Sequence, residues 1–144
     1  MAMIIHVDIV SAEEEIYSGQ AEMVFAPAEL GEVGIAPRHA PFLARLQSGE
    51  VRVKTTSGEE LPFFVSGGMI EVQPHIVTVL ADTAVRARDI DEAAALEAKR
   101  RAEEALKDRS GKIDYAKAQA ELAEAVKQLQ VLERYKKHKG RFEK

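Results

Sequence analysis

The chain has 144 residues, no cysteine, 31% charged residues and a formal net charge of −4. This length fits one medium domain or a small domain with an appendage, and the missing cysteines exclude disulfides and cysteine-based zinc sites and favour a reducing, cytosolic compartment. No apolar run approaches the roughly 18 residues of a membrane span, and residues 1–8 lack the basic flank and apolar core of a signal peptide.

The charge divides unevenly along the chain. Residues 1–84 contain four basic and twelve acidic residues, a net of −8, whereas residues 85–144 contain sixteen basic and twelve acidic residues, a net of +4. Such a division indicates two surfaces that meet different partners. A solvated helix pair with a basic end would produce the same count, so the charge alone leaves both interpretations open.

The first half of the chain has the pattern of β-strands. All five prolines and seven of the nine glycines lie before residue 85, and they separate short alternating runs at Ile5–Ile9, Val51–Thr55 and Ile76–Leu80. Runs of period two with regular turn signals predict an antiparallel sandwich or barrel. Pro62 indicates an edge strand or a bulge, and the Gly-rich segment Ser66–Met69 is expected to be a tight turn.

The pattern becomes helical after residue 85. Asp89 and Glu92 have the spacing of a capping box, and Ser110-Gly111 has the composition of a helix end. A second helix is expected to begin near Asp114, and the two helices, of about 19 and 23 residues, form an antiparallel hairpin. The apolar stripes predicted for the two helices are Ile90, Ala94, Ala98, Ala102, Ala105 and Leu106, and Leu122, Val126, Leu129 and Leu132.

The predicted hairpin is rich in small side chains. Eleven alanines lie between Asp89 and Gln130, and alanines let helices approach closely but bury little apolar area. Burial yields roughly 25 cal/mol per Å², against an ordering cost of roughly 1.5 kcal/mol per residue. The helix pair is therefore expected to lean on a partner surface and to hold any one partner weakly, which suits a switch.

The sequence offers no motif for catalysis. No phosphate-binding loop is present, and the four histidines His6, His39, His75 and His138 lack metal-ligand spacing. A Ser-His-Asp arrangement stays open, although no nucleophile-elbow motif supports one. We therefore expect a non-catalytic subunit with no resident cofactor or metal.

Three segments carry a resemblance to a known family. They are residues 31–41, 66–74 and 79–86. Together with the helical tail, they resemble the epsilon subunit of bacterial F-type ATP synthases, over about Val7 to Lys137. The resemblance implies an α+β fold, with an antiparallel β-sandwich of about ten strands over residues 1–86 and a two-helix hairpin over residues 87–144.

The resemblance also implies a role and partners. Such a subunit belongs to the rotor, binds the gamma subunit and the ring of c subunits, and couples proton-driven rotation to ATP synthesis in the alpha/beta catalytic head. It lies on the cytoplasmic face of the bacterial inner membrane as a peripheral component, without nucleic-acid partners or membrane insertion. In many bacteria the helices extend along gamma and block ATP hydrolysis.

Residue by residue, the resemblance assigns two contact regions. Glu32 and His39 match the loop that faces the c-ring, although Arg38 stands where glycine is usual. The alternative for His39 is a loop histidine bonded to the backbone. The basic end matches the part that meets an acidic loop of the catalytic beta subunit, and a frayed, solvated terminus is its alternative. The residues of this basic end are Arg134, Lys136, Lys137, Lys139 and Arg141.

Nucleotide binding by the helices is not expected. Family members that bind ATP there carry Ile/Leu-Asp-x-x-Arg-Ala, in which the arginine pairs with phosphate. Here Ala94 replaces that arginine, which leaves Ile90, Asp91 and Arg101 as the remaining candidate contacts. The second helix offers Glu124 and Gln128 where basic residues would help.

A different class of function remains as the alternative. The same two-part chain would suit a free ATP-sensing or adaptor module outside any synthase. Co-purification of gamma and head subunits distinguishes the two interpretations.

Overall fold

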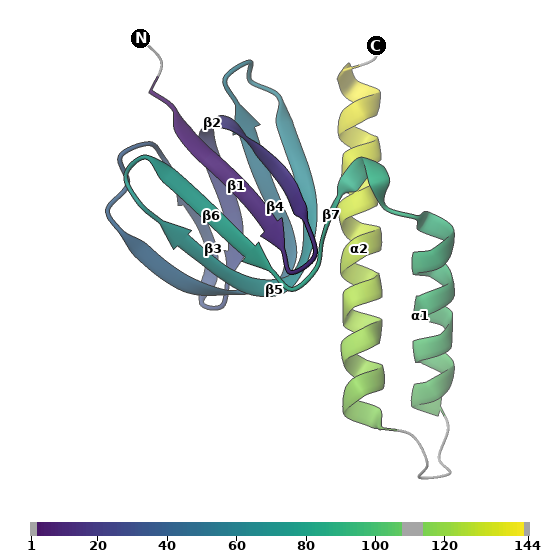
Figure 1. Ribbon diagram of the computed structural model, residues 1–144. Helices are drawn as coiled ribbons and strands as arrows, with labels where there is room; N and C mark the ends of the chain where they lie inside the picture. The colour runs from purple at the N-terminus through teal and green to yellow at the C-terminus, as the bar shows by residue number, and fades with distance from the viewer. Residues whose placement is uncertain (1–2, 108–113, 143–144) are drawn as a thin grey trace. The chain divides into compact units, whose positions relative to one another are not determined.

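The computed structural model describes residues 3–107 and 114–142, with side chains described as far as Lys137 in the last helix. The chain divides into two compact units, Met1–Ala87 and Arg88–Lys144. The first is a β-sandwich and the second consists of two antiparallel helices (Figure 1). The fold class predicted from the sequence is therefore confirmed.

The sandwich is one continuous sheet that curves back on itself. Its strand order is β1-β6-β5-β4-β2-β3, β7 pairs with β5, and an additional antiparallel pairing of β1 with β2 completes the ring. β1 and β6 run parallel, and the other pairings are antiparallel. The strands are β1 (Ile5–Ser11), β2 (Glu15–Ala28), β3 (Gly31–Ile35), β4 (Phe42–Thr55), β5 (Glu60–Val72), β6 (Ile76–Ala81) and β7 (Ala84–Arg86).

The described residues form seven strands rather than about ten. Strands β2, β4 and β5 have 14, 14 and 13 residues, more than twice the usual length of about five to six. β2 and β5 change partner along their course: β5, for example, pairs with β7 over Phe63–Val65 and with β6 over Gly68–Val72. A long strand that contributes to both layers of the sandwich is counted as one strand, so the total is lower than predicted.

The core contains the residues that the alternating pattern assigns to it. Ile5, Val7 and Ile9 are at most 1% exposed, and Val51 and Val53 are completely buried. Each such aliphatic side chain contributes about 1.5–3 kcal/mol by leaving water. The residues between them, such as His6 and Arg52, therefore lie on the outer face.

The sequence made two predictions for β5, of which the tight turn needs correction. The Gly-rich segment is not a turn but a bend within β5, where Gly67 and Gly68 take φ values of 120° and 134°. A Cβ on Gly68 would lie 2.0 Å from the carbonyl oxygen of Leu80, so the close approach of β6 requires glycine. Pro62 precedes the stretch that β7 covers, so the strand pairs with β4 alone at this residue and has a local edge there, in agreement with the first of the two predicted alternatives.

The helical unit begins with a 3-10 turn, Ala87–Asp89, and continues as α1 (Glu92–Lys107) and α2 (Tyr115–Phe142). The cap of α1 is Asp91 rather than Asp89, because the Ala94 amide donates to Asp91 Oδ1 at 3.0 Å. Asp114 caps α2 through the Lys117 amide at 3.2 Å, as expected. The predicted helix end at Ser110-Gly111 lies outside the described residues. The helices have 16 and 28 residues, so the second is longer than predicted.

The buried faces of the helices follow a seven-residue spacing of small side chains. Ala102 is buried on α1, as predicted, and Ala95 is buried with it, whereas the predicted stripe positions Ala94 and Ala98 are exposed. On α2 the corresponding buried residues are Ala118, Ala125 and Leu132. Alanines occupy several faces of α1, and because each carries a weak hydrophobic signal, the sequence pattern did not distinguish the buried face. Seven-residue spacing keeps one face toward a partner helix.

Candidate functional site

Glu32 lies on β3, the last strand in the sheet order. Its side chain is 56% exposed and accepts a hydrogen bond from Arg52, with 2.8 Å between Arg52 Nη2 and Glu32 Oε1. The predicted contact residue is therefore exposed, but its carboxylate is already held by a neighbour from another strand.

Arg52 is the centre of a charged cluster on the outer face of the sheet. Its guanidinium lies 4.4 Å from the centroid of the Phe25 ring on β2. Its nitrogens also lie 3.4 Å from Glu50 Oε1 on β4 and 3.5 Å from Glu60 Oε1 on β5. Arg52 thus links β2, β3, β4 and β5, and its side chain is 17% exposed. Sequence reasoning placed Arg52 on an outer face but did not identify this role, because Glu32 lies twenty positions away.

His39 lies in the connection between β3 and β4. The Arg38 amide donates to the Pro74 carbonyl at 3.0 Å, which ties this connection to the β5–β6 turn. His39 Nδ1 lies 2.7 Å from the Ala40 carbonyl oxygen, and its ring is 6.2 Å from the Phe42 ring. None of the contacts described for His39 and Glu32 is a contact between these two residues. Arg38 has a φ of 65°, a left-handed conformation that explains why glycine suits this position.

The candidate nucleotide contacts at α1 are engaged in local bonds. Asp91 uses Oδ1 to cap the helix, and Ile90 is buried at 9% exposure. Arg101 lies 3.4 Å, measured from Nε, from Glu97 Oε1. A phosphate at this helix would therefore compete with existing partners, and it would find alanine at position 94.

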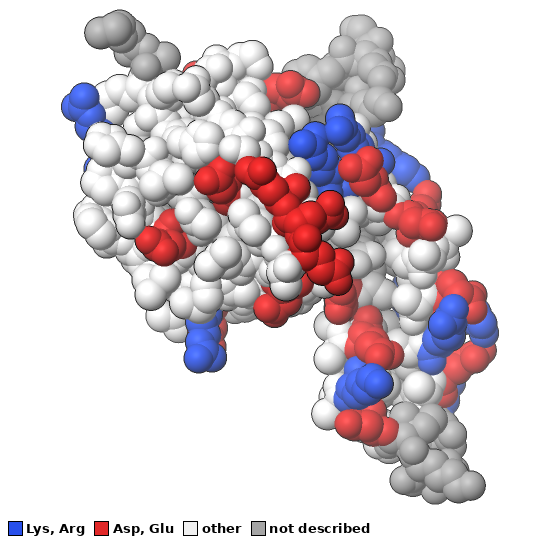
Figure 2. Space-filling model, viewed as in Figure 1, with Lys and Arg blue, Asp and Glu red and all other residues white. Residues whose placement is uncertain are grey.

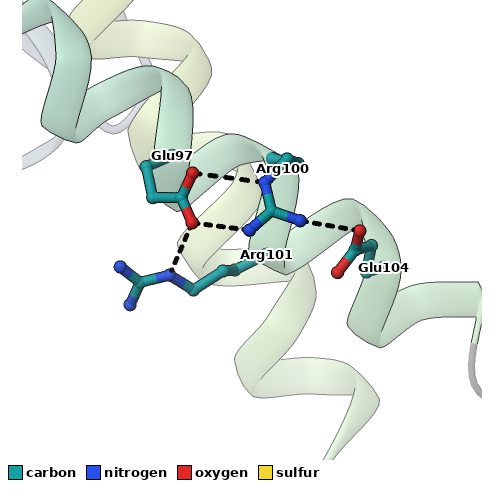
Figure 3. A network of polar contacts seen from close by, with 4 residues as sticks. All are labelled: Glu97, Arg100, Arg101 and Glu104. Carbon is teal, nitrogen blue, oxygen red and sulfur yellow. Dashed lines mark hydrogen bonds and ion pairs between the residues drawn. The ribbon is translucent and has the colours of Figure 1, made fainter.

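Four charged residues form a network along α1. Figure 3 shows Glu97 between Arg100 and Arg101, with Arg100 also reaching Glu104. The hydrogen bonds from Arg100 and then from Arg101 hold the pKa of Glu97 below its usual value of 4.5. The hydrogen bond to Glu97 and the charge of Glu104 raise the pKa of Arg100. All four residues belong to α1, so the network stabilises this helix without a partner.

The basic tail is part of α2 and bonds to α1. Lys136 Nζ lies 2.6 Å from Glu92 Oε2 in the first turn of α1, with the two side chains 55% and 51% exposed. Lys137 lies 3.6 Å from Glu133 on its own helix. Arg134 is exposed, and the side chains of Lys139 and Arg141 lie outside the described residues. The start of α1 and the end of α2 are therefore joined by a charged contact.

The two units differ in the arrangement of their charges. Figure 2 shows acidic side chains gathered on the visible face of the sandwich, whereas basic and acidic side chains alternate along the helices. The alternation on α1 reflects pairs three and four residues apart, such as Arg100 with Glu97 and Glu104. The acidic excess of residues 1–84 thus lies on the surface.

One Ser-His-Asp group is present, but its geometry does not suit a nucleophile. His6 Nε2 lies 2.9 Å from Asp8 Oδ1 and 3.1 Å from Ser18 Oγ. A catalytic histidine uses one ring nitrogen for the serine and the other for the carboxylate, whereas here both partners share Nε2. Ser18 itself donates to Asp8 at 2.7 Å, so the three side chains form a closed surface cluster.

Within the described part of the chain, neither a cluster of metal-binding side chains nor a helix suited to cross a membrane is found. Among these residues, no group of three or more histidines and carboxylates is placed to hold a metal ion. No helix in the described ranges combines the length and apolar character that a membrane crossing requires.

Comparison with known proteins identifies the class. Residues 4–87 match the family model for the β-sandwich domain of the ATP synthase delta/epsilon chain, and residues 88–133 match the model for its long α-helix domain. The chain belongs to this family, as the resemblance predicted. A relative from Methylococcus capsulatus, named ATP synthase epsilon chain 1, is 71% identical over 95% of this chain and 98% of its own length. The ATP synthase epsilon chain of Nitrosococcus oceani is 67% identical over 97% of this chain and 100% of its own.

Solved structures share the fold at low identity. A chain of the Euglena gracilis mitochondrial ATP synthase, in a structure of OSCP, F1 and the c-ring, has a TM-score of 0.68 at 18% identity. The alignment covers 96% of this chain and 82% of the other. A chain from the central stalk and c-ring of the Tetrahymena thermophila mitochondrial ATP synthase has a TM-score of 0.54 at 14% identity over 92% of this chain and 97% of the other.

Proposed function

We propose that this chain is a non-catalytic rotor subunit of a proton-translocating ATP synthase on the cytoplasmic face of a bacterial inner membrane. It couples rotation of the c-ring to ATP synthesis in the catalytic head and restrains ATP hydrolysis through its helices. Family membership and the bacterial epsilon chains among its relatives support this assignment. The similar structures agree with it, since one is of OSCP, F1 and the c-ring and the other is of the central stalk and c-ring of mitochondrial ATP synthases.

The sandwich is the part that docks on the rotor. Glu32 and His39 meet the c-ring, and gamma binds the same unit. The exposed carboxylate of Glu32 and the tethered connection that carries His39 support this role, because a bond to a neighbouring strand or turn holds each of these polar regions. The unit has its own apolar core, so a fragment of residues 1–86 is expected to fold and to support coupled synthesis.

The helical unit is the part that inhibits. The observation that carries this proposal is the bond between Lys136 and Glu92, which holds a cation of the basic tail against the start of α1. When the hairpin opens, Arg134, Lys136 and Lys137 become available to an acidic loop of the catalytic beta subunit. The bond is exposed and joins helices that pack through alanine, so it is weak enough to break.

The length of the helices suits such a contact. At 1.5 Å per residue, α1 and α2 are roughly 24 and 42 Å long, from 16 and 28 residues. The internal ion pairs of α1 would survive opening, because they do not involve α2. The unit therefore opens as two intact helices rather than by unfolding.

Two experiments test the proposal. A tagged chain expressed at its native level should co-purify with gamma, alpha and beta subunits; a free pool without them would favour the adaptor alternative. Removing the residues after Glu133 should raise ATP hydrolysis by the assembled enzyme and leave synthesis nearly intact. Unchanged hydrolysis at low salt would refute the inhibitory role and leave rotor docking alone.

The chain is also proposed to lack a tight ATP site. The capping bond of Asp91 and the contact of Arg101 with Glu97 support this, as does alanine at position 94. Calorimetry on the isolated chain with magnesium should show no binding tighter than about millimolar, which corresponds to roughly 4 kcal/mol. Micromolar binding would contradict the proposal.

A further inference from the structure

The outer face of the sandwich contains a charged arrangement that the assigned contacts do not explain. Arg52 is the shared partner of Glu32, Glu50 and Glu60, which come from three strands. The Cζ atom of its guanidinium lies over the Phe25 ring, while its nitrogens lie close to the carboxylates. An arginine combines a flat face for an aromatic ring with five donors at its edge, whereas a lysine has neither the flat face nor the fork of donors.

The bond to Glu32 differs from the other two in length and exposure. At 2.8 Å it is the shortest of the three, and its carboxylate is the most exposed, at 56% against 12% for Glu50 and 29% for Glu60. Glu32 also lies on a five-residue strand that, among the described residues, pairs only with β2. Arg52 therefore reaches across β2 and fixes an exposed carboxylate on a strand with little support of its own.

We propose that Arg52 is a positioning residue for the rotor contact of Glu32. It holds Oε1 of the carboxylate and so restricts the side chain to one orientation before the partner binds. A carboxylate held in this way accepts hydrogen bonds from a donor or cation on the c-ring, and less side-chain freedom is lost on binding. One positive charge among three carboxylates leaves the cluster net negative, which suits a donor-bearing partner. This inference rests on the proposed contact between Glu32 and the c-ring.

The conservative variant Arg52→Lys tests the idea. A lysine keeps the charge but loses the stacking face and the fork of donors, so it cannot hold Glu32 and contact Phe25 together. The full-length chain is titrated onto a purified complex of gamma and the c-ring, and its Kd is measured. Arg52→Lys should weaken binding about two- to fivefold, the range of one exposed charged contact.

A double-mutant cycle separates positioning from a general structural effect. Glu32→Gln should weaken binding by a similar factor, and Arg52→Lys should add nothing in the Glu32→Gln background, because the two residues then act as one unit. Glu60→Gln is the matched control: it removes another carboxylate bonded to Arg52 and should bind as the wild type does. Thermal unfolding of each variant confirms that the sandwich is intact.

The measured Kd values of the variants distinguish the positioning role of Arg52 from the rotor contact of Glu32 itself. If Glu32→Gln weakens binding while Arg52→Lys does not, Arg52 has no positioning role and the rotor contact stands. Fully additive losses in the double variant would likewise overturn the inference, since Arg52 would then act independently of Glu32. If Glu32→Gln binds as the wild type does, the Glu32 contact itself is wrong and the positioning role falls with it.

Discussion

Substitutions of Glu92 and of Lys136 should affect ATP hydrolysis differently, although the two residues form one ion pair with each other. Replacing Glu92 by glutamine frees Lys136 and opens the hairpin without changing the tail. Replacing Lys136 by methionine also opens the hairpin but removes a cation that the extended tail uses. Under the proposed mechanism, Glu92→Gln lowers hydrolysis by the assembled enzyme, whereas Lys136→Met leaves it equal or higher.

The magnitude follows from the geometry of the pair. Nζ of Lys136 and Oε2 of Glu92 are 2.6 Å apart, but both side chains are about half exposed. An exposed pair contributes about 0.2–1 kcal/mol, so its loss shifts the ratio of closed to open hairpin by a factor of about 1.4 to 5. The difference from wild type should shrink as salt rises, because the Debye length falls from about 10 Å at 0.1 M to about 3 Å at 1 M.

The assay pairs hydrolysis with a direct measure of opening. The chain has no cysteine, so spin labels can be attached at introduced cysteines, for example in place of Ala98 on α1 and Lys127 on α2, which are both exposed. Glu103→Gln is the control, since its partner Lys99 lies 4.0 Å away on the same helix. If the two helices stay equally close in Glu92→Gln, or if both variants change hydrolysis in the same direction, the reasoning is refuted.

Three further predictions concern stability. Gly68→Ala should lower the free energy of unfolding of the sandwich by more than about 2 kcal/mol, because its Cβ would meet the Leu80 carbonyl; a denaturant melt with little change would contradict the close approach of β6 to β5 at this residue. Arg38→Gly should raise that free energy by about 0.5–1 kcal/mol by relieving the positive φ, whereas Arg45→Gly on a strand should lower it. Glu97→Gln should reduce the helix content measured at neutral pH. The pKa of Glu97 is depressed in the folded chain, so its contribution to helix stability is present above pH 4.5 and is lost as the pH falls. The helix contents of the variant and the wild type should therefore converge in acid.

Local sequence signals predicted much of this molecule. The alternation around Ile5 to Ile9 and Val51 to Thr55 identified strands and their buried faces, and Asp114 identified a helix start. Such features depend on residues within one turn or one strand, where side-chain periodicity and capping chemistry act directly. The resemblance of the loop and tail segments then indicated the family, which the comparisons confirm.

Other features depended on the tertiary structure. The cap at Asp91 instead of Asp89 and the burial of Ala95 in place of Ala94 and Ala98 were decided by packing, because several carboxylates and alanines compete at similar spacing. The bend at Gly67 and Gly68 exists because β5 changes partner there, which no local pattern records.

The sequence by itself determined the two parts of the chain, the β or α character of each, and the charge that each carries. The tertiary structure alone decided which charges meet: Arg52 with Glu32 across β2, and Lys136 with Glu92, forty-four positions apart. The reason is physical. Periodicity is set by neighbouring residues in the chain, whereas an ion pair between distant residues requires the order of the sheet and the antiparallel pairing of the helices to bring them within a few ångströms.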